Sequence, residues 1–181
     1  MSNGTGGFLN PEKVLFQLGI KPGMKVADFG CGHGYFAIPL ARLIKDNGFV
    51  FAIDVLPDAI EAVNSKIKLF NLSNIKTIRA NVEMFGGSSL NGSSIDMVLL
   101  ANILFQSKKK SDIIKEARRV LKSNGKLIII DWKVNNLLAP KEGWLISKEQ
   151  SIKLAQKQGF IFEKEFEVDK SHYGLVFIKS F

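Results

Sequence analysis

A glycine-rich turn is the part of this sequence best suited to chemistry. The segment Val-Ala-Asp-Phe-Gly-Cys-Gly-His-Gly at residues 26–34 lies between an expected strand and an expected helix, with glycines at Gly30, Gly32 and Gly34. Alternate glycines let the backbone turn sharply and approach a ligand closely, while free N–H groups of the following helix face it. The spacing is not the G-x-G-x-x-G of nicotinamide-binding folds, because Tyr35 occupies the third glycine position. The segment therefore predicts a ligand-binding loop and argues against a nicotinamide dehydrogenase.

Acidic side chains stand at the ends of the expected strands. Asp28 precedes the glycines, and Asp54 ends the second strand, at the edge of an open α/β sheet where ligands bind. The Asp54 carboxylate can accept from two neighbouring hydroxyls, or it can complement the helix N-terminus before Pro57. Asp131 leaves the fifth strand at the same edge and is a candidate catalytic base or substrate-orienting group, or else a loop-capping acid. Asp96 lies at the opposite end of its strand, which indicates a structural role.

The histidines and one tryptophan complete the set of candidate side chains. His33 is interpreted as a turn residue, and His172 as a surface residue in a hairpin turn away from the site. Residues 134–146 follow the fifth strand and include Trp144, and the segment is long enough to form a pocket wall or lid.

Alternating strands and helices must position these residues. Strands are expected at residues 25–30, 49–55, 75–80, 95–101, 126–131, 160–168 and 173–180. Five helices are expected between or before these strands. The first begins after an N-cap at Asn10, before Pro11, the second covers residues 35–45, and the third carries an apolar stripe from Ile60 to Phe70. The fourth has an N-cap at Ser111 and ends at Asn124–Gly125, and the fifth begins with a capping box at Ser147 and Gln150 and ends at Gly159. The pattern is that of a doubly wound α/β fold.

The last two expected strands carry the clearest topological signal. Only residues 169–172 join them, whereas parallel neighbours need a crossover of a dozen or more residues. The two strands are therefore predicted to run antiparallel as a hairpin.

The motif Asp28-x-Gly30-x-Gly32-x-Gly34 resembles the first motif of class I S-adenosylmethionine-dependent methyltransferases, and the similarity extends from Asn10 to Phe160. The resemblance implies a Rossmann-like, doubly wound seven-stranded sheet of order 3-2-1-4-5-7-6 with an antiparallel last strand. It also implies S-adenosyl-L-methionine as the cofactor. The expected organisation is a single domain over residues 1–181, with 1–8 as a flexible tail.

The resemblance also implies the cofactor-binding residues. They are Asp28, Gly30, Cys31, Gly32, Gly34, Asp54, Val55, Asn81, Val82, Ala101 and Asn102. Asp28 and the glycine loop would hold the methionine part, and Asp54 the ribose hydroxyls. Asn81 replaces the acid that relatives place near the adenine amine, although its carbonyl can accept the same hydrogen bond. Ala101 and Asn102 follow the fourth strand, where relatives line the methyl group.

Composition and the absence of certain motifs limit the classes of acceptor that the protein could methylate. A net charge of +8 is compatible with an RNA partner, but the basic residues are spread between acidic ones on helix faces. The lone Cys31 excludes an internal disulfide, a cysteine zinc cage and multi-cysteine arsenite binding, and no metal site is expected. The Asn/Asp-Pro-Pro-aromatic motif of amino-group methyltransferases is absent.

These observations predict a methyltransferase with a small-molecule acceptor. The alternatives are an RNA or protein methyltransferase, or a module that binds S-adenosylmethionine without catalysis. The sequence has no secretory signal or apolar span, so a cytoplasmic location is expected, and it does not indicate an oligomeric state.

Overall fold

The computed structural model describes residues 9–45, 47–141 and 143–180, and the expected tail at residues 1–8 lies outside this part of the chain. The strands are β1 (Lys25–Phe29), β2 (Phe49–Asp54), β3 (Ile75–Arg79), β4 (Ile95–Ala101), β5 (Leu121–Trp132), β6 (Phe160–Phe166) and β7 (His172–Lys179). The helices are α1 (Pro11–Phe16), α2 (Ala37–Ile44), α3 (Pro57–Leu69), α4 (Lys110–Val120) and α5 (Lys148–Lys157), with a 3₁₀ turn η1 (Leu104–Gln106). None of the described helices is long and apolar enough to cross a bilayer.

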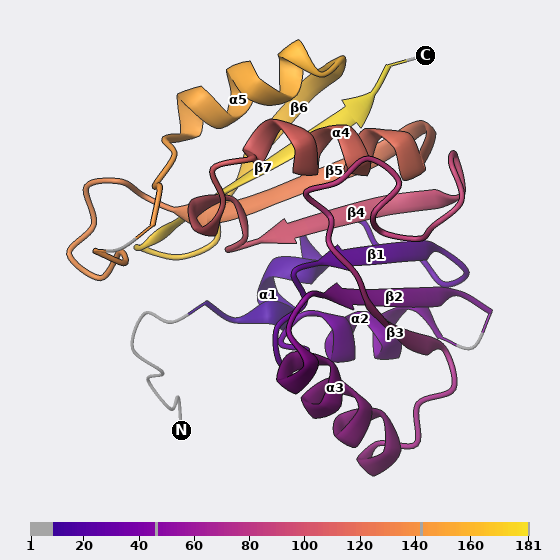
Figure 1. Cartoon of the computed structure of the whole chain (residues 1–181). Coiled ribbons are helices and arrows are strands. Elements are labelled where there is room, and N and C mark those ends of the chain that lie inside the picture. Colours follow the sequence, from indigo (N-terminus) through magenta and orange to yellow (C-terminus); the bar gives the residue numbers. More distant parts are fainter. Residues whose placement is uncertain (1–8, 46, 142, 181) are drawn as a thin grey trace.

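The strands form one sheet of seven, in the order β3-β2-β1-β4-β5-β7-β6 (Figure 1). β7 pairs antiparallel with both β5 and β6, while the other neighbours are parallel. The predicted fold class, strand order and terminal hairpin are therefore confirmed.

Two hydrophobic layers cover the sheet. α1, α2 and Val63 of α3 pack on one face, and α4 and α5 pack on the other. The interior strands supply both layers because successive side chains point to opposite faces. In β5, for example, Leu127 and Ile129 enter one core, while Ile128 and Ile130 enter the other.

Local signals place several helix ends. The Asn10 side chain accepts from the Lys13 backbone N–H, and Ser147 and Gln150 form the expected capping box. Gly159 follows α5 with a φ of +80°, a left-handed conformation that glycine adopts without a Cβ penalty.

The boundary between α4 and β5 corrects the sequence interpretation. α4 begins at Lys110 and ends at Val120, so Ser111 is not its N-cap and Asn124 does not end it. Leu121 already pairs with Ile95, and the register shifts before the next pairs form. Turn-forming residues are found at β-bulges as well as at helix ends, and here they form an irregularity inside β5.

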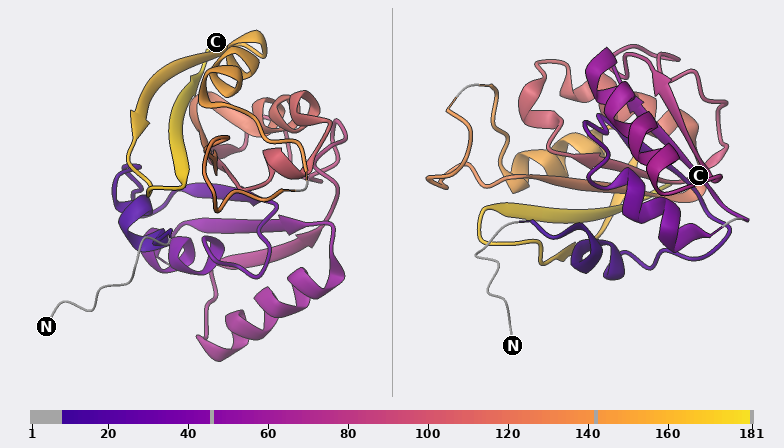
Figure 2. Two further views of the ribbon diagram at one scale, coloured as in Figure 1. Left: turned by 90° about the vertical axis from the view of Figure 1, so that its left-hand side faces the viewer. Right: turned by 90° about the horizontal axis from the view of Figure 1, so that it is seen from below.

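The carboxyl edge of the sheet brings distant segments together. β1, β4 and β5 end there, and because β7 is antiparallel to β5, it begins there, with His172 paired in register to Trp132. Figure 2, left, looks onto this edge, with the long segment after β5 standing over it.

Candidate functional site

The glycine loop after β1 is fastened to the end of β2. The backbone N–H groups of Gly30 and Cys31 both donate to the Ile53 carbonyl, at 2.8 and 3.0 Å. Gly30 has a φ of +71°, and a Cβ there would lie 2.7 Å from Ile103 Cδ1. Gly32 has a φ of +48° with open space where a Cβ would be. The loop therefore turns tightly on one side and leaves room for a ligand on the other.

Two acceptor atoms beside this loop are buried without partners. Asp28 Oδ2 and Asn102 Oδ1 make no hydrogen bond in the part of the chain that the structure describes. Burial, together with the nearby Asp54 carboxylate, raises the pKa of Asp28 to about 7, although a backbone hydrogen bond from Ala37 opposes this. Because buried polar groups are normally satisfied, both oxygens indicate a ligand that brings donors.

A cavity of about 530 Å³ joins these atoms, which is a usual size for a small-molecule site. It is lined by Leu9, Asp28, Gly30, Cys31, Gly32, His33, Tyr35, Phe36, Ala101, Asn102, Gln106, Trp132, Leu138, Asp169, Ser171 and His172. Of the residues expected to bind cofactor, six therefore share one cavity: Asp28, Gly30, Cys31, Gly32, Ala101 and Asn102. Gly34, Asp54, Val55, Asn81, Val82 and the proposed base Asp131 are not among its lining residues.

Asp54 organises the glycine loop from outside the cavity. Its Oδ2 accepts from the Gly32 backbone N–H at 2.9 Å, and its Oδ1 accepts from the Leu56 N–H at 3.0 Å. Asn81 likewise caps its own turn, because its Oδ1 accepts from the Glu83 N–H at 2.9 Å. A carboxylate oxygen has more than one lone pair, so the assignment of Asp54 to the ribose stays a prediction.

Asp131 is buried, and its carboxylate is used by the backbone. It accepts from the Trp132 N–H at 2.8 Å and from the Phe105 N–H at 3.2 Å, which fixes η1 over the end of β5. Burial raises its pKa to about 6, and these backbone hydrogen bonds limit the rise. Its catalytic role stays a prediction, and its contacts are those of the loop-capping alternative.

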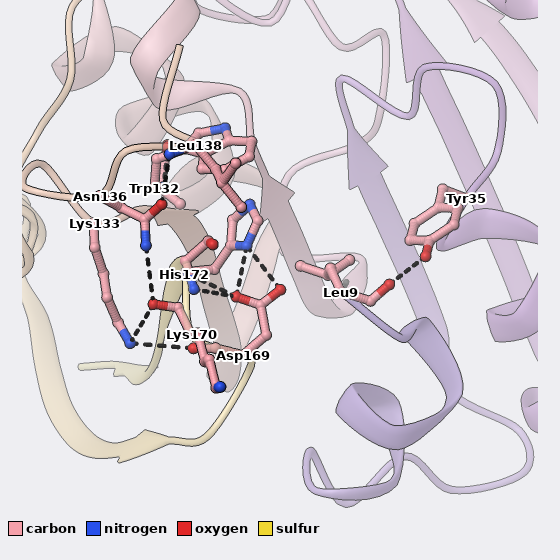
Figure 3. A network of polar contacts seen from close by, with 11 residues as sticks. Leu9, Tyr35, Trp132, Lys133, Asn136, Leu138, Asp169, Lys170 and His172 are labelled. Atoms are coloured by element: carbon pink, nitrogen blue, oxygen red, sulfur yellow. Dashed lines mark hydrogen bonds and ion pairs between the residues drawn. The ribbon is translucent and has the colours of Figure 1, made fainter. Parts of the chain in front are cut away.

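His172 is not a surface residue, and this sequence interpretation is wrong. Only 6% of it is exposed, it lines the cavity, and its ring lies against Trp132 with centroids 4.0 Å apart (Figure 3). Its Nδ1 lies 2.9 and 3.0 Å from the two carboxylate oxygens of Asp169. The antiparallel hairpin was itself a signal for this position, since a strand antiparallel to β5 must start where β5 ends.

The segment after β5 contributes to the cavity lining, but through Leu138 and not through Trp144. Trp144 does not line the cavity: its backbone N–H donates to the Phe105 carbonyl, and Lys108 Nζ lies 4.8 Å from its ring centroid. Leu138 lines the cavity instead. Lys133 Nζ and the Asn136 side chain donate to backbone carbonyls of the hairpin turn, including that of Lys170 at 3.4 and 3.2 Å (Figure 3).

The opposite rim is formed near the start of the described chain. The Tyr35 hydroxyl donates to the Leu9 carbonyl, and both residues line the cavity (Figure 3). No spacing pattern in the sequence predicts this contact, because the two residues lie 26 positions apart in separate segments.

Comparisons with known proteins identify the fold and its cofactor. The family model described as "Methyltransferase domain" matches residues 20–172, so this chain belongs to that methyltransferase family. A solved S-adenosylmethionine-dependent methyltransferase from Aquifex aeolicus superposes with a TM-score of 0.83 and 25% identity, over 94% of this chain and 89% of that one. S-adenosyl-L-methionine is therefore the cofactor of this family fold.

Curated relatives are similar over part of their length. A probable cobalt-precorrin-6B C(15)-methyltransferase of Methanosarcina mazei is 34% identical over 95 residues, which is 51% of each chain. A ubiquinone/menaquinone biosynthesis C-methyltransferase of Shewanella oneidensis is 28% identical over 145 residues, covering 72% of this chain and 57% of that protein. The chain thus spans about half the length of the curated relatives that it matches.

The residues present fit the cofactor. Its methionine part carries an ammonium group, which can donate to the unpartnered oxygens of Asp28 and Asn102. The open face of Gly32 leaves space for the ligand against the backbone. Asp28, in β1, and the glycine loop that follows this strand form the cofactor wall, while Trp132 and His172 lie at the edge of β5 and β7 and form the β5–β7 wall. β4 separates β1 from β5 in the sheet, and Asn102 follows β4.

Proposed function

We propose that this chain transfers the methyl group of S-adenosylmethionine to a small-molecule acceptor. One observation carries the proposal. Three buried side-chain N and O atoms lack a partner in the described chain, namely Asp28 Oδ2, Asn102 Oδ1 and His172 Nε2, and their residues all line the same cavity. Unsatisfied buried polar atoms are uncommon, so their concentration in one cavity favours a binding site.

The protein residues have positioning tasks in this proposal. Asp28 and Asn102 would hold the methionine part of the cofactor, and Asp54 would hold both the glycine loop and the ribose. When bound, the cofactor supplies a methyl group already activated by its sulfonium, so the protein mainly needs to align two molecules and exclude water. Asp131 would act on the acceptor only through η1 and Trp132, which its carboxylate fixes.

Charge in the cavity supports a small acceptor. The described lining contains Asp28 and Asp169 but no lysine or arginine, although the whole chain carries a net charge of +8. A polymer bound through its phosphates needs basic side chains near the reacting centre. The curated relatives described above are a probable cobalt-precorrin-6B methyltransferase and a methyltransferase of ubiquinone/menaquinone biosynthesis, which is consistent with a small organic acceptor.

The test is a transfer assay with methyl-labelled cofactor. Purified protein is offered the small-molecule fraction of a cell extract, total RNA and total protein in parallel, and calorimetry measures S-adenosylhomocysteine binding. Label in the small-molecule fraction with 1:1 binding supports the proposal. Label mainly in RNA or protein contradicts the acceptor class, and binding without transfer to any fraction favours a non-catalytic binding module.

A cytoplasmic location remains a prediction, which imaging of the tagged protein can check.

A further inference from the structure

We propose that His172 is the acceptor-side catalytic residue, whose Nε2 binds the reacting O–H or N–H group of the substrate and takes its proton. Asp169 is proposed as the positioning residue for this imidazole. The inference rests on the proposed function and names the class of acceptor that the site takes: one whose nucleophilic atom carries a hydrogen.

The turn between β6 and β7 fixes the Asp169 carboxylate first. Its Oδ1 accepts from the backbone N–H groups of Ser171 and His172, both at 2.7 Å. Burial alone would raise the pKa of Asp169, but hydrogen bonds from the His172 ring and from these N–H groups lower it. Asp169 is therefore held as a carboxylate, which can only accept hydrogen bonds.

A fixed carboxylate determines the imidazole tautomer. His172 Nδ1 lies within 3.0 Å of both Asp169 oxygens, so the hydrogen of a neutral ring belongs on Nδ1. The lone pair is then on Nε2. Trp132 packs on the ring face and restricts its rotation, so that Nε2 stays aimed away from Asp169.

His172 Nε2 makes no hydrogen bond within the part of the chain that the structure describes. It is buried without a hydrogen-bond partner, and its residue lines the same cavity as Asp28 and Asn102. A histidine that served only to hold the turn would complete that task with Nδ1 alone. A free basic atom facing a binding cavity is what an acceptor with an O–H or N–H donor requires.

The other titratable groups of the cavity do not offer this atom. Tyr35 donates its hydroxyl hydrogen to Leu9, and both oxygens of Asp169 are used by His172. Burial, with Asp28 and Asp54 nearby, raises the pKa of Cys31 and so disfavours its thiolate. Asp28 and His33 belong to the end of β1 and the glycine loop, which β4 separates from β5 and β7 in the sheet.

The proposed step balances without a further reactant. The acceptor's lone pair forms a bond to the methyl carbon, the carbon–sulfur bond breaks with its electron pair passing to sulfur, and the acceptor's proton passes to Nε2. The positive charge thus moves from sulfur to the imidazole, where the Asp169 carboxylate stabilises it.

The first experiment reads the ring directly and does not depend on activity. In ¹⁵N-labelled protein, long-range ¹H–¹⁵N NMR should show that the neutral ring of His172 is the Nδ1–H tautomer, with an unprotonated Nε2. The chain has two histidines, so the His33→Asn variant assigns the signal. An Nε2–H tautomer would overturn the proposal.

The second experiment separates chemistry from structure with two substitutions at one position. His172→Asn keeps an amide near Nδ1, to donate to Asp169, but removes Nε2, whereas His172→Gln places an amide oxygen near Nε2. Using the labelled product that wild type makes from the small-molecule fraction, kcat should fall on the order of 10²-fold or more in both variants. KM should rise in His172→Asn and be largely restored in His172→Gln, and affinity for S-adenosylhomocysteine should stay within twofold.

Lys170→Ala is the matched control in the same turn, because its side chain is exposed and does not line the cavity. It should retain wild-type kcat. Wild-type activity that persists in His172→Asn refutes the role of His172 while leaving the proposed function intact. Absence of transfer by wild type refutes the proposed function, and the inference fails with it.

Discussion

Replacing Asp28 with asparagine tests the buried acid at the centre of the cofactor wall. In the folded chain the pKa of Asp28 is raised from 3.8 to about 7, with burial as the main cause. At 1.36 kcal/mol per pKa unit, ionising this group inside the ligand-free protein costs about 4 kcal/mol relative to the unfolded chain.

The sign of the pH effect follows from proton binding. Between pH 4 and 7 the folded state holds a proton on Asp28 that the unfolded state has released, so this group makes the free energy of unfolding fall as pH rises. Asp28→Asn removes that dependence. The stability of the variant relative to wild type should therefore increase by about 2–3 kcal/mol between pH 5 and pH 8.

Urea unfolding of both proteins at pH 5 and pH 8 measures this difference, and other titrating groups cancel because both proteins contain them. An equal difference at the two pH values would refute the reasoning. Ligand binding gives a second readout, because an ammonium beside Asp28 favours the ionised carboxylate. Calorimetry at pH 7 in buffers of different ionisation enthalpy should show release of about half a proton when wild type binds S-adenosylhomocysteine.

Substitutions at Gly32, Asp54 and Glu116, with Gly19→Val as a control, test the glycine loop, the carboxylate that holds it and a separate buried ion pair. Gly32→Val brings its Cβ within 4 Å of no described atom beyond its two chain neighbours, but valine strains a backbone with a φ of +48°, so the loop should shift and S-adenosylhomocysteine binding in calorimetry should be abolished. Gly19→Val, with a similar φ of +67° and equal space, should bind normally, and equal binding by both variants would contradict the loop assignment. Asp54→Ala should weaken binding by about 1.5–3 kcal/mol, and a 2′-deoxyribose analogue should lose little further affinity in this variant. A full additional loss would show that Asp54 does not bind the ribose. Glu116→Gln should lower the free energy of unfolding at pH 7 by about 3 kcal/mol, because Glu116 is buried and pairs with Arg119 at 2.7 Å. Burial alone would raise the Glu116 pKa, but hydrogen bonds from Arg119 and Ser88 lower it to about 2, so this loss should shrink as urea unfolding is repeated toward pH 3.

The sequence was sufficient for the features that depend on local chemistry. Strand periodicity, the Ser147 capping box and the short link before β7 predicted the elements and the antiparallel hairpin that the structure contains. The end of α4 was not predictable in this way, because Asn124 and Gly125 are typical of a helix end and of a bulge alike, and only pairing of Leu121 with Ile95 decides between them.

In the candidate site, too, the residues set by local sequence were predicted and those set by strand pairing were not. The cofactor wall, from Asp28 through the glycine loop, is contiguous in sequence, so its residue types identified it, whereas Ala101 and Asn102 were assigned from the family resemblance. The β5–β7 wall depends on the register that sets His172 beside Trp132, residues far apart in the chain. No local pattern reports that register, although the hairpin prediction, followed one step further, would have placed both residues at the same edge.

The position of β7 has a consequence for folding on the ribosome. β7 lies between β5 and β6, yet it is made after both, so these strands must wait for it before the sheet reaches its final order. Because chains are synthesised from the N-terminus, β1 to β4 and the glycine loop can assemble before β7 is made, whereas the wall containing His172 must wait for β7. A nascent chain arrested before β7 is expected to expose the unpaired edge of β5, which makes that interval the one in which a chaperone is most useful.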